Sequence, residues 1–302
     1  MRNKGKKLKI VLAVLLIIIA VFCVNKIYRY VKNGPIRKFN KSYYSYLSKE
    51  ASVKSARTNS INFKASKTKY KNNSSSVPVL MYHSIGHASF NPFVLDPIKF
   101  KADMKYLKDN NYTTLSIDQF YDFILNNEPV PKRSVLITLD DGYRDNYTEA
   151  YPILKKYGLK ATIFVITNYI DTQKNYMTSD QLKEMRKNNI DIESHTLNHE
   201  NLAKLSYKRQ LKTLLESKEN LEKMLDCKID YLAYPFGKYN LDTLKAEKAA
   251  GYKMAFTFQG KWTNKSNGIL TLNRVFVSGF HRLASFEKRV KTPYYLFQEF
   301  YY

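Results

Sequence analysis

The residues best suited to chemistry are two neighbouring aspartates and three histidines, which stand at the ends of predicted strands. Asp140 and Asp141 follow an apolar run in the segment LITLDDG. His195 follows the segment IDIES, with His199 four residues later, and His83 ends the segment VPVLMYH. Each group alone is typical of a solvated loop, a helix cap or a core histidine. In a chain with five histidines, their shared position at strand ends indicates a site.

The segment HTLNH suits a metal ion. If it is helical, His195 and His199 lie one turn apart on the same face. Two imidazoles and one carboxylate give three ligands and leave a position open for water, which is the arrangement of catalytic zinc. The pattern therefore predicts a catalytic metal site of the zinc type.

The elements that must position these residues alternate between strand-like and helix-like segments from Val77 onward. This alternation favours a parallel sheet with covering helices, either an open α/β sheet or a barrel. The 226 residues from 77 to 302 are close to the size of a (β/α) barrel. In such barrels the chemistry lies at the carboxyl ends of the strands, where the aspartates and histidines are expected.

Four segments carry a resemblance to a known family. TLDDG at 138–142 resembles the T-F-D-D-G motif of the polysaccharide deacetylases, also called the NodB-homology group or carbohydrate esterase family 4. HTLNH at 195–199 matches that family's H-[ST]-x-x-H, and YPFG at 234–237 matches the end of its third motif, R-x-P-[FY]. VPVLMYHSIG at 77–86 resembles a bacterial branch that includes deacetylases of peptidoglycan and poly-N-acetylglucosamine. The resemblance covers roughly residues 77–302 and implies a distorted (β/α) barrel of the NodB type.

The resemblance also implies a role for each site residue. Asp141, His195 and His199 would hold the metal, usually zinc. Asp140 would be the general base that takes a proton from the attacking water. The backbone N–H of Phe236 would stabilise the oxyanion formed on the acetamide carbonyl. A protonated histidine would then deliver a proton to the departing sugar amine.

Two positions depart from the family pattern. The third motif normally begins with an arginine that orients the catalytic aspartate, whereas Ala233 stands here. We expect Arg274, in the late strand segment LNRVFV, to replace it. The late L-x-H-type motif that supplies the usual acid histidine is not found, and His281 is interpreted as an exposed loop residue. Because the N-terminal histidine fills the acid role in the Met-Tyr-His branch, we assign that role to His83.

The first part of the chain is strongly basic. The formal charge is +24, and residues 1–76 contain 18 lysines and arginines against one acid. The continuous apolar run at 10–24 lacks a small-residue cleavage pattern and predicts an uncleaved transmembrane anchor over residues 10–27. The positive-inside rule places the basic residues 1–9 in the cytoplasm.

Residues 28–76 have little apolar periodicity and predict a basic extracytoplasmic linker, with some helix around KSYYSYLSKE. Its charge would be drawn to anionic lipids or anionic wall polymers. The catalytic domain, residues 77–302, then lies outside the cell membrane. Within it, Trp262 is a candidate platform for a sugar, and a surface-packed tryptophan is the alternative.

Together these features predict a metal-dependent N-deacetylase acting on GlcNAc residues of peptidoglycan or poly-N-acetylglucosamine. One alternative function with the same chemistry is an O-acetyl esterase such as an acetyl-xylan esterase. Because the third-motif arginine is missing, a catalytically silent carbohydrate-binding relative is a second alternative. A nucleic-acid partner is not expected, because most of the positive charge belongs to the first 76 residues rather than to the domain.

Overall fold

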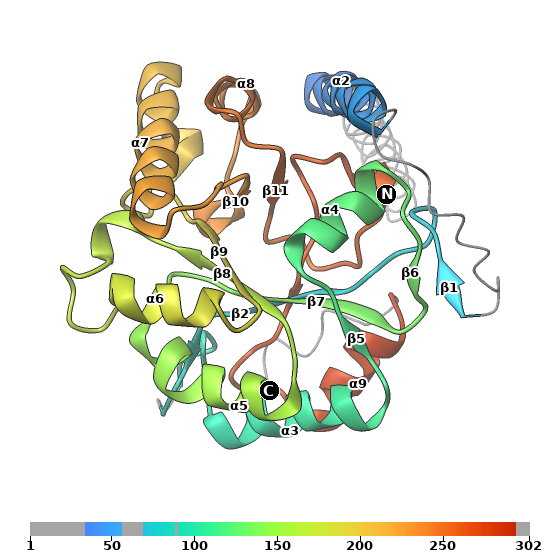
Figure 1. Ribbon diagram of the computed structural model, residues 1–302, viewed down its shortest axis with the longest axis vertical. Helices are drawn as coiled ribbons and strands as arrows, with labels where there is room; N and C mark the ends of the chain where they lie inside the picture. The colour runs from blue at the N-terminus through green and yellow to red at the C-terminus, as the bar shows by residue number, and fades with distance from the viewer. Residues whose placement is uncertain (1–33, 56–68, 88–89, 294–302) are drawn as a thin grey trace, which may run out of the picture.

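The centre of the domain is a curled sheet of parallel strands (Figure 1). The computed structural model describes residues 34–55, 69–87 and 90–293. In these residues the strands of the main sheet follow the order β11 (Met254–Phe256), β10 (Tyr231–Ala233), β9 (Ile190–Ser194), β8 (Ala161–Val165), β7 (Ser134–Leu139), β2 (Val79–Tyr82) and β12 (Val275–Phe276), and β5 (Thr113–Thr114) pairs with the start of β7. All these pairings are parallel, which confirms the expected α/β class and brings the carboxyl ends of the strands together.

An irregular segment connects the two outer strands of the sheet. Leu272 forms a parallel bridge with Phe256 of β11, and its N–H donates to the carbonyl of Ala255 over 3.0 Å. Three residues later, Val275 of β12 pairs with Leu80 of β2. The chain therefore passes from one edge of the sheet to the other, so the strand ends surround a common centre.

Helices cover the outside of the sheet, with α3 packed beside α5 and α9 and α7 packed beside α8 (Figure 1). Three helices begin with a capping box, at Ser116, Thr178 and Asn240. The helices of the domain are α3 (Pro97–Asp109), α4 (Ile117–Leu125), α5 (Tyr151–Tyr157), α6 (Ser179–Arg186), α7 (Tyr207–Leu225), α8 (Leu241–Ala250) and α9 (Leu283–Lys291). Shorter elements are β1 (Tyr70–Lys71), β3 (Ser84–Ile85), β4 (Val94–Leu95), β6 (Val130–Pro131), the π-helix η1 (Asn146–Ala150) and the 3-10 turns η2 (Thr167–Tyr169), η3 (Leu202–Lys204), η4 (Pro235–Gly237) and η5 (Lys265–Asn267).

The segment predicted to be a linker, residues 28–76, is partly folded onto the domain. Helix α2 (Pro35–Ser55) covers the expected helical stretch and packs against α8 and α4. Tyr43 is buried, and its hydroxyl donates to the carbonyl of Tyr252 over 2.6 Å. Strand β1 pairs with β6. The helix is weakly apolar by itself, but the domain supplies the surface that it needs, so the folded unit extends ahead of Val77.

Among the helices of the described residues, none has the length and apolar character needed to span a bilayer. The predicted anchor over residues 10–27 and the predicted cytoplasmic tail over residues 1–9 lie outside the described residues.

Candidate active site

Asp140 is fixed by Arg274 in a buried pair. Nη1 of Arg274 donates to Oδ1 of Asp140 over 2.6 Å, and Nη2 donates to Oδ2 over 2.7 Å. Arg274 is 1% exposed, and its Nε donates to the carbonyl of Thr257. Burial raises the pKa of Asp140, but the charges of Arg274 and His195 outweigh it, and the net pKa lies below its usual range. Asp140 is therefore an ionised carboxylate that can accept a proton.

The arginine in this pair comes from a different strand than the family motif uses. Ala233, at the motif position, ends β10 and has no charge to offer. Arg274 stands directly before β12, on the segment that crosses between the sheet edges. The structure thus places Arg274 where the sequence predicted it, in contact with Asp140.

Asp141, His195 and His199 form a cluster that could hold a metal ion. One ligand atom from each of the three lies within 4.8 Å of the others. Oδ1 of Asp141 is 3.4 Å from Nε2 of His195 and 3.3 Å from Nε2 of His199. Burial raises the pKa of Asp141, but its interactions with the neighbouring imidazoles of His195, His83 and His199 outweigh burial, so the net pKa is lowered.

Two details show that these groups fit a metal. Oδ1 of Asp141 is buried and has no hydrogen-bond partner among the described residues, and a buried oxygen of this kind costs free energy unless something binds it. Nδ1 of His195 lies 2.8 Å from the carbonyl of Ala233. Because a carbonyl can only accept, Nδ1 carries a proton, and Nε2, which faces Asp141, is the nitrogen that would bind a metal.

A sharp turn after β7 separates the two aspartates. Asp141 has a φ of 72° and Gly142 a φ of 80°, both in the left-handed region. A Cβ at Gly142 would lie 2.9 Å from Cγ1 of Val165, so only glycine fits there without movement. The turn directs neighbouring carboxylates to different partners, Asp140 to Arg274 and Asp141 to the histidines.

The segment from His195 to His199 is a turn and not the helix that the spacing suggested. Thr196 and His199 have φ values of 68° and 60°, which interrupt any helix. Glu200 orders the turn, since its carboxylate accepts from the hydroxyl groups of Thr196 and Thr213, each over 2.7 Å. Sequence reasoning missed Glu200, although its spacing of four from Thr196 was visible.

His83 also lies close to Asp140. Its Nε2 is 3.9 Å from Oδ2 of Asp140, and its ring packs edge-on against Phe93. Burial lowers the pKa of His83, and the nearby charge of Asp140 opposes this. Asn146 donates to the carbonyl of His83 over 2.8 Å, and the neighbouring Asp145 accepts from the N–H of Ile85. Asp145 and Asn146 follow the segment DDG at 140–142 and were not predicted as site residues. They hold the loop that carries His83 in place.

Phe236 stands at the rim of the site. Its backbone is left-handed, with a φ of 59°, and its ring is 4.6 Å from that of His199 between centroids. The next residue, Gly237, lies so close to Phe258 that a Cβ would be 2.5 Å from the Cβ of that phenylalanine. Phe236 is 57% exposed, so the aromatic ring faces solvent beside the predicted metal ligands.

His281 does not behave as the sequence suggested, and Trp262 follows one of its two alternatives. His281, expected to be exposed, is buried: its Nε2 is 2.9 Å from Oδ1 of Asp103. Its loop folds onto α3, which supplies that aspartate. Trp262 is half-buried, and its Nε1 donates to the carbonyl of Arg289 over 2.6 Å, which favours the surface-packed alternative over a sugar platform.

Fold and site together define a curled parallel α/β domain that carries an arginine-paired carboxylate beside an Asp-His-His cluster. Residues 127–255 match the family described as polysaccharide deacetylase. The chain is 41% identical over 202 residues to the putative polysaccharide deacetylase YxkH of Bacillus subtilis (strain 168), covering 67% of this chain and 71% of that protein. This chain belongs to the polysaccharide deacetylase family.

Two further similarities agree with this assignment. The chain is 30% identical over 239 residues to the poly-beta-1,6-N-acetyl-D-glucosamine N-deacetylase of Staphylococcus aureus (strain MRSA252), covering 70% of this chain and 81% of that protein. The structure is similar to that of the Streptococcus pyogenes deacetylase PplD in complex with acetate, with a TM-score of 0.69 and 33% identity over 72% of this chain and 99% of that one.

Proposed function

We propose that this protein removes acetyl groups from GlcNAc residues of a cell-surface or cell-wall polysaccharide, either peptidoglycan or poly-N-acetylglucosamine, and that it depends on a divalent metal, most often zinc. The observation that carries the proposal is the ionised Asp140, held by Arg274 directly beside the Asp141–His195–His199 cluster. The N-deacetylase activity named for the S. aureus relative supports an amide rather than an ester as the bond cleaved.

In this proposal each residue has one task. Asp140 accepts the proton of the attacking water: its lowered pKa keeps it ionised and free to accept, and it directly precedes Asp141 of the cluster. His83, protonated during the reaction, donates to the departing amine from its position beside Asp140. The backbone N–H of Phe236 stabilises the oxyanion. A divalent ion bound by the cluster would polarise the acetamide carbonyl and lower the pKa of water.

An intact set of polar groups supports an active enzyme over a catalytically silent carbohydrate-binding relative. The base, its arginine partner and the three candidate metal ligands are all present and in contact. The arginine absent from the third motif is matched by Arg274. The same groups would also hydrolyse an O-acetyl ester, so substrate choice needs a direct measurement.

The test is acetate release by the purified full chain, measured on peptidoglycan, poly-N-acetylglucosamine, chitin oligomers and acetyl-xylan. We expect release from the GlcNAc polymers, loss of release after dialysis against a chelator, and recovery on adding Zn²⁺. Elemental analysis of the same preparation measures the bound metal. Release from acetyl-xylan alone would identify an esterase, and full release after verified metal removal would contradict the metal dependence.

We also propose that the protein is a single-pass membrane protein with its catalytic domain outside the cytoplasm. The apolar run at 10–24, flanked by basic residues, supports this arrangement. Protease treatment of intact protoplasts checks it: we expect the domain to be cleaved from outside and to sediment with membranes before cleavage. A domain protected in intact protoplasts would contradict the orientation.

A further inference from the structure

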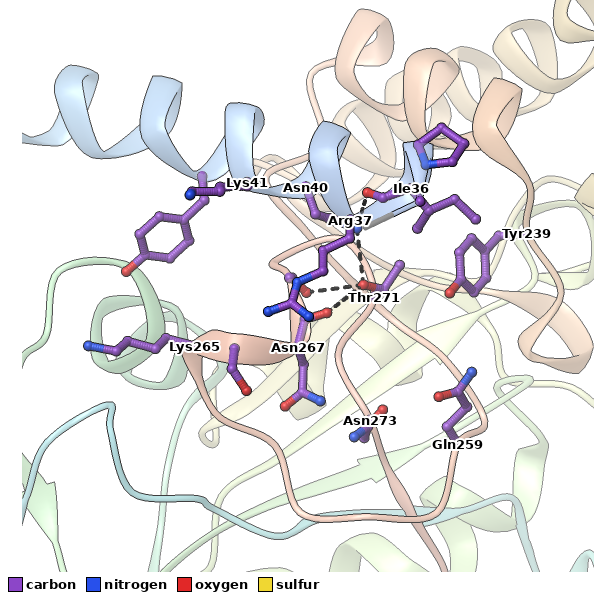
Figure 2. A pocket seen from close by; sticks show the side chains of 15 residues that line it. Ile36, Arg37, Asn40, Lys41, Tyr239, Gln259, Lys265, Asn267, Thr271 and Asn273 are labelled. Atoms are coloured by element: carbon purple, nitrogen blue, oxygen red, sulfur yellow. Dashed lines mark hydrogen bonds between the residues drawn. The ribbon is translucent and has the colours of Figure 1, made fainter. Parts of the chain in front are cut away.

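A polar cavity of about 490 Å³ lies between helix α2 and the segment that leads into β12 (Figure 2). Its walls come from Pro35 to Tyr44 of α2, from Lys265 to Asn273, and from Tyr239 and Gln259. The volume falls within the range of sites that bind small molecules, roughly 300–1,000 Å³. Asp141, His195 and His199 do not line it, so it is separate from the catalytic cluster. We call it the α2 cavity.

The wall of the α2 cavity is built by specific contacts. Asn40 of α2 is buried; its side chain donates to Oγ1 of Thr271 over 3.1 Å and accepts from the N–H of Leu270 over 3.1 Å. Gly268 has a φ of 84°, and a Cβ there would lie 2.7 Å from Cγ of Asn40. The helix and the segment 265–273 are therefore fitted to each other, which gives the cavity a fixed shape.

The side chains that line the α2 cavity are positive or neutral. Arg37, Lys41 and Lys265 contribute three cations, and no aspartate or glutamate is among the lining residues. Within the described part of the chain these three cations have no ion-pair partner. Figure 2 shows Arg37 extending from α2 toward Asn267 and Thr271. Three cations without a carboxylate favour an anionic ligand.

The remaining groups that line the α2 cavity are of types that bind sugars in other proteins. Amide side chains come from Gln259, Asn267 and Asn273, and amides can donate to and accept from hydroxyl groups. In Asn267 the oxygen already accepts from Thr263, so its amide nitrogen is the group available to a ligand. Tyr44 and Tyr239 add aromatic rings, and the hydroxyl of Tyr44 is used in hydrogen bonds to the carbonyls of Ile124 and Leu125. The combination of amides, tyrosines and unopposed cations fits a sugar that carries a negative group better than a free inorganic ion or an apolar molecule.

The α2 cavity adjoins the active site through short links. Tyr239 follows Phe236 by three residues, and Gln259 follows Phe258, which packs against Gly237. The carbonyl of Gln259 accepts from the backbone N–H of Arg274, whose side chain holds Asp140. The residues that line the cavity are thus direct neighbours of residues in the candidate active site, and a polysaccharide bound at the cluster must extend past Phe236 to reach the cavity.

We propose that the α2 cavity binds an anionic sugar unit, bearing a carboxylate or a phosphate, of the same polysaccharide whose acetylated unit occupies the catalytic cluster. This inference rests on the proposed function. It makes α2 a specificity element that favours an anionic glycan over a neutral one. The deacetylated product of a GlcNAc homopolymer, which carries ammonium groups, is repelled by the same three cations.

The experiment compares matched tetrasaccharides as substrates of the full chain. In the first, GlcNAc alternates with N-acetylmuramic acid, whose lactyl group is a carboxylate; in the second, that carboxylate is a primary amide. A third carries 6-phosphate in place of the lactyl acid and separates the two sources of charge. The variant is Arg37→Gln with Lys265→Gln, and Lys101→Gln on α3, remote from the cavity and exposed, is the matched control.

At low salt we expect the wild-type KM to be about five- to tenfold lower for the carboxylate or the phosphate substrate than for the amide, which is the range for one or two partly exposed charge contacts. The double variant should lose this difference with kcat unchanged, and Lys101→Gln should keep it. A wild type that does not distinguish acid from amide, or a double variant that retains the preference, overturns the inference.

A calorimetric titration separates this inference from the proposed function. If no tetrasaccharide releases acetate, the proposed function fails, but binding of the carboxylate tetrasaccharide can still be measured on the same proteins. Tighter binding by wild type than by the double variant then supports the α2 cavity as an anionic-sugar site. Equal binding by the two proteins contradicts it.

Discussion

Two buried clusters of histidine and aspartate lie in this domain, and their hydrogen bonds set them apart. In the candidate active site, Oδ1 of Asp141 faces two imidazoles and has no hydrogen-bond partner among the described residues. In the second cluster, Oδ1 of Asp103 is 2.9 Å from Nε2 of His281, and Oδ2 accepts from Tyr82 over 3.1 Å. The residue types are shared, so the difference between the two clusters lies in the unsatisfied oxygen of Asp141, which is free to bind a metal, and in the fully hydrogen-bonded Asp103.

The two clusters also differ in access. The side chain of His199 is 26% exposed, whereas that of His281 is 2% exposed. Nδ1 of His281 bonds to the carbonyl of Ser278 over 2.8 Å, so both of its nitrogens are used. The second cluster ties the loop after β12 to α3, and the first is open toward substrate.

The largest expected effect comes from exchanging the charged carboxylate in each region for an amide. Asp140→Asn should lower acetate release about 10²–10⁴-fold while metal content is retained, because the base is lost and the ligands are not. Asp103→Asn should leave kcat nearly unchanged and lower the free energy of unfolding by about 3 kcal/mol, since it breaks a buried pair. Activity assays and urea unfolding measure both. Full activity of Asp140→Asn would show that Asp140 is not the general base and would remove the functional distinction between the two clusters.

The histidines provide the next test. His199→Gln should lose most of the bound metal and the acetate release that depends on it, because one of three ligands is gone. His281→Gln should keep its metal and lose about 1–3 kcal/mol of stability through an unsatisfied Asp103. Elemental analysis and thermal unfolding separate the two. Metal loss in His281→Gln but not in His199→Gln would reverse the assignment.

A smaller effect is expected at Arg274. Arg274→Lys replaces two parallel hydrogen bonds to Asp140 with a single ammonium group, so the carboxylate is held less firmly. We expect acetate release to fall about 10- to 100-fold with metal content unchanged. Arg282→Lys, on an exposed residue of the same part of the chain, is the control and should match wild type. Equal rates for both variants would show that Asp140 does not need Arg274.

The smallest effect is expected in the pH dependence of stability, at Glu247, a buried carboxyl group whose pKa is not lowered by a nearby cation. Burial raises the pKa of Glu247 well above its ordinary value, and the hydrogen bond from Tyr234 only partly opposes this. In the unfolded chain Glu247 loses its proton near its ordinary pKa of 4.5, whereas in the folded protein it keeps the proton to a higher pH. The free energy of unfolding of the wild type therefore falls as the pH rises from 4.5 toward the folded pKa. Glu247→Gln should therefore match wild type near pH 4 and be more stable at pH 7. Urea unfolding at both values measures this, and a constant difference across pH would contradict it.

The active-site residues could be predicted because their types and spacing are local. The doublet Asp140–Asp141 and the pair His195–His199 follow strands whose parallel order brings their ends together. Arg274 could be predicted from the family pattern, because Ala233 stands where the motif has an arginine and Arg274 lies in a late strand segment; its contact with Asp140 is visible only in the structure.

The remaining features depend on contacts between distant segments, which the sequence does not display. His281 lies 178 residues from Asp103, so its burial had no local signal. Helix α2 docks through an apolar face of Ile36, Phe39, Tyr43 and Leu47, and the side chains of Asn40 and Tyr43 add hydrogen bonds to distant parts of the domain. Glu200 orders the histidine turn, and a surface glutamate in such a segment looks ordinary.

The docking of α2 limits how far the enzyme can reach. A flexible linker of residues 28–76 would let the catalytic domain sample a wide zone around its anchor, but α2 fixes the chain to the domain from Pro35 onward. If residues 10–27 are the anchor proposed above, only residues 28–34 remain between them and α2, and seven residues span at most about 25 Å. The enzyme would then work on polymer close to the membrane surface. It would act on polysaccharide chains as they are exported rather than on the outer layers of the wall.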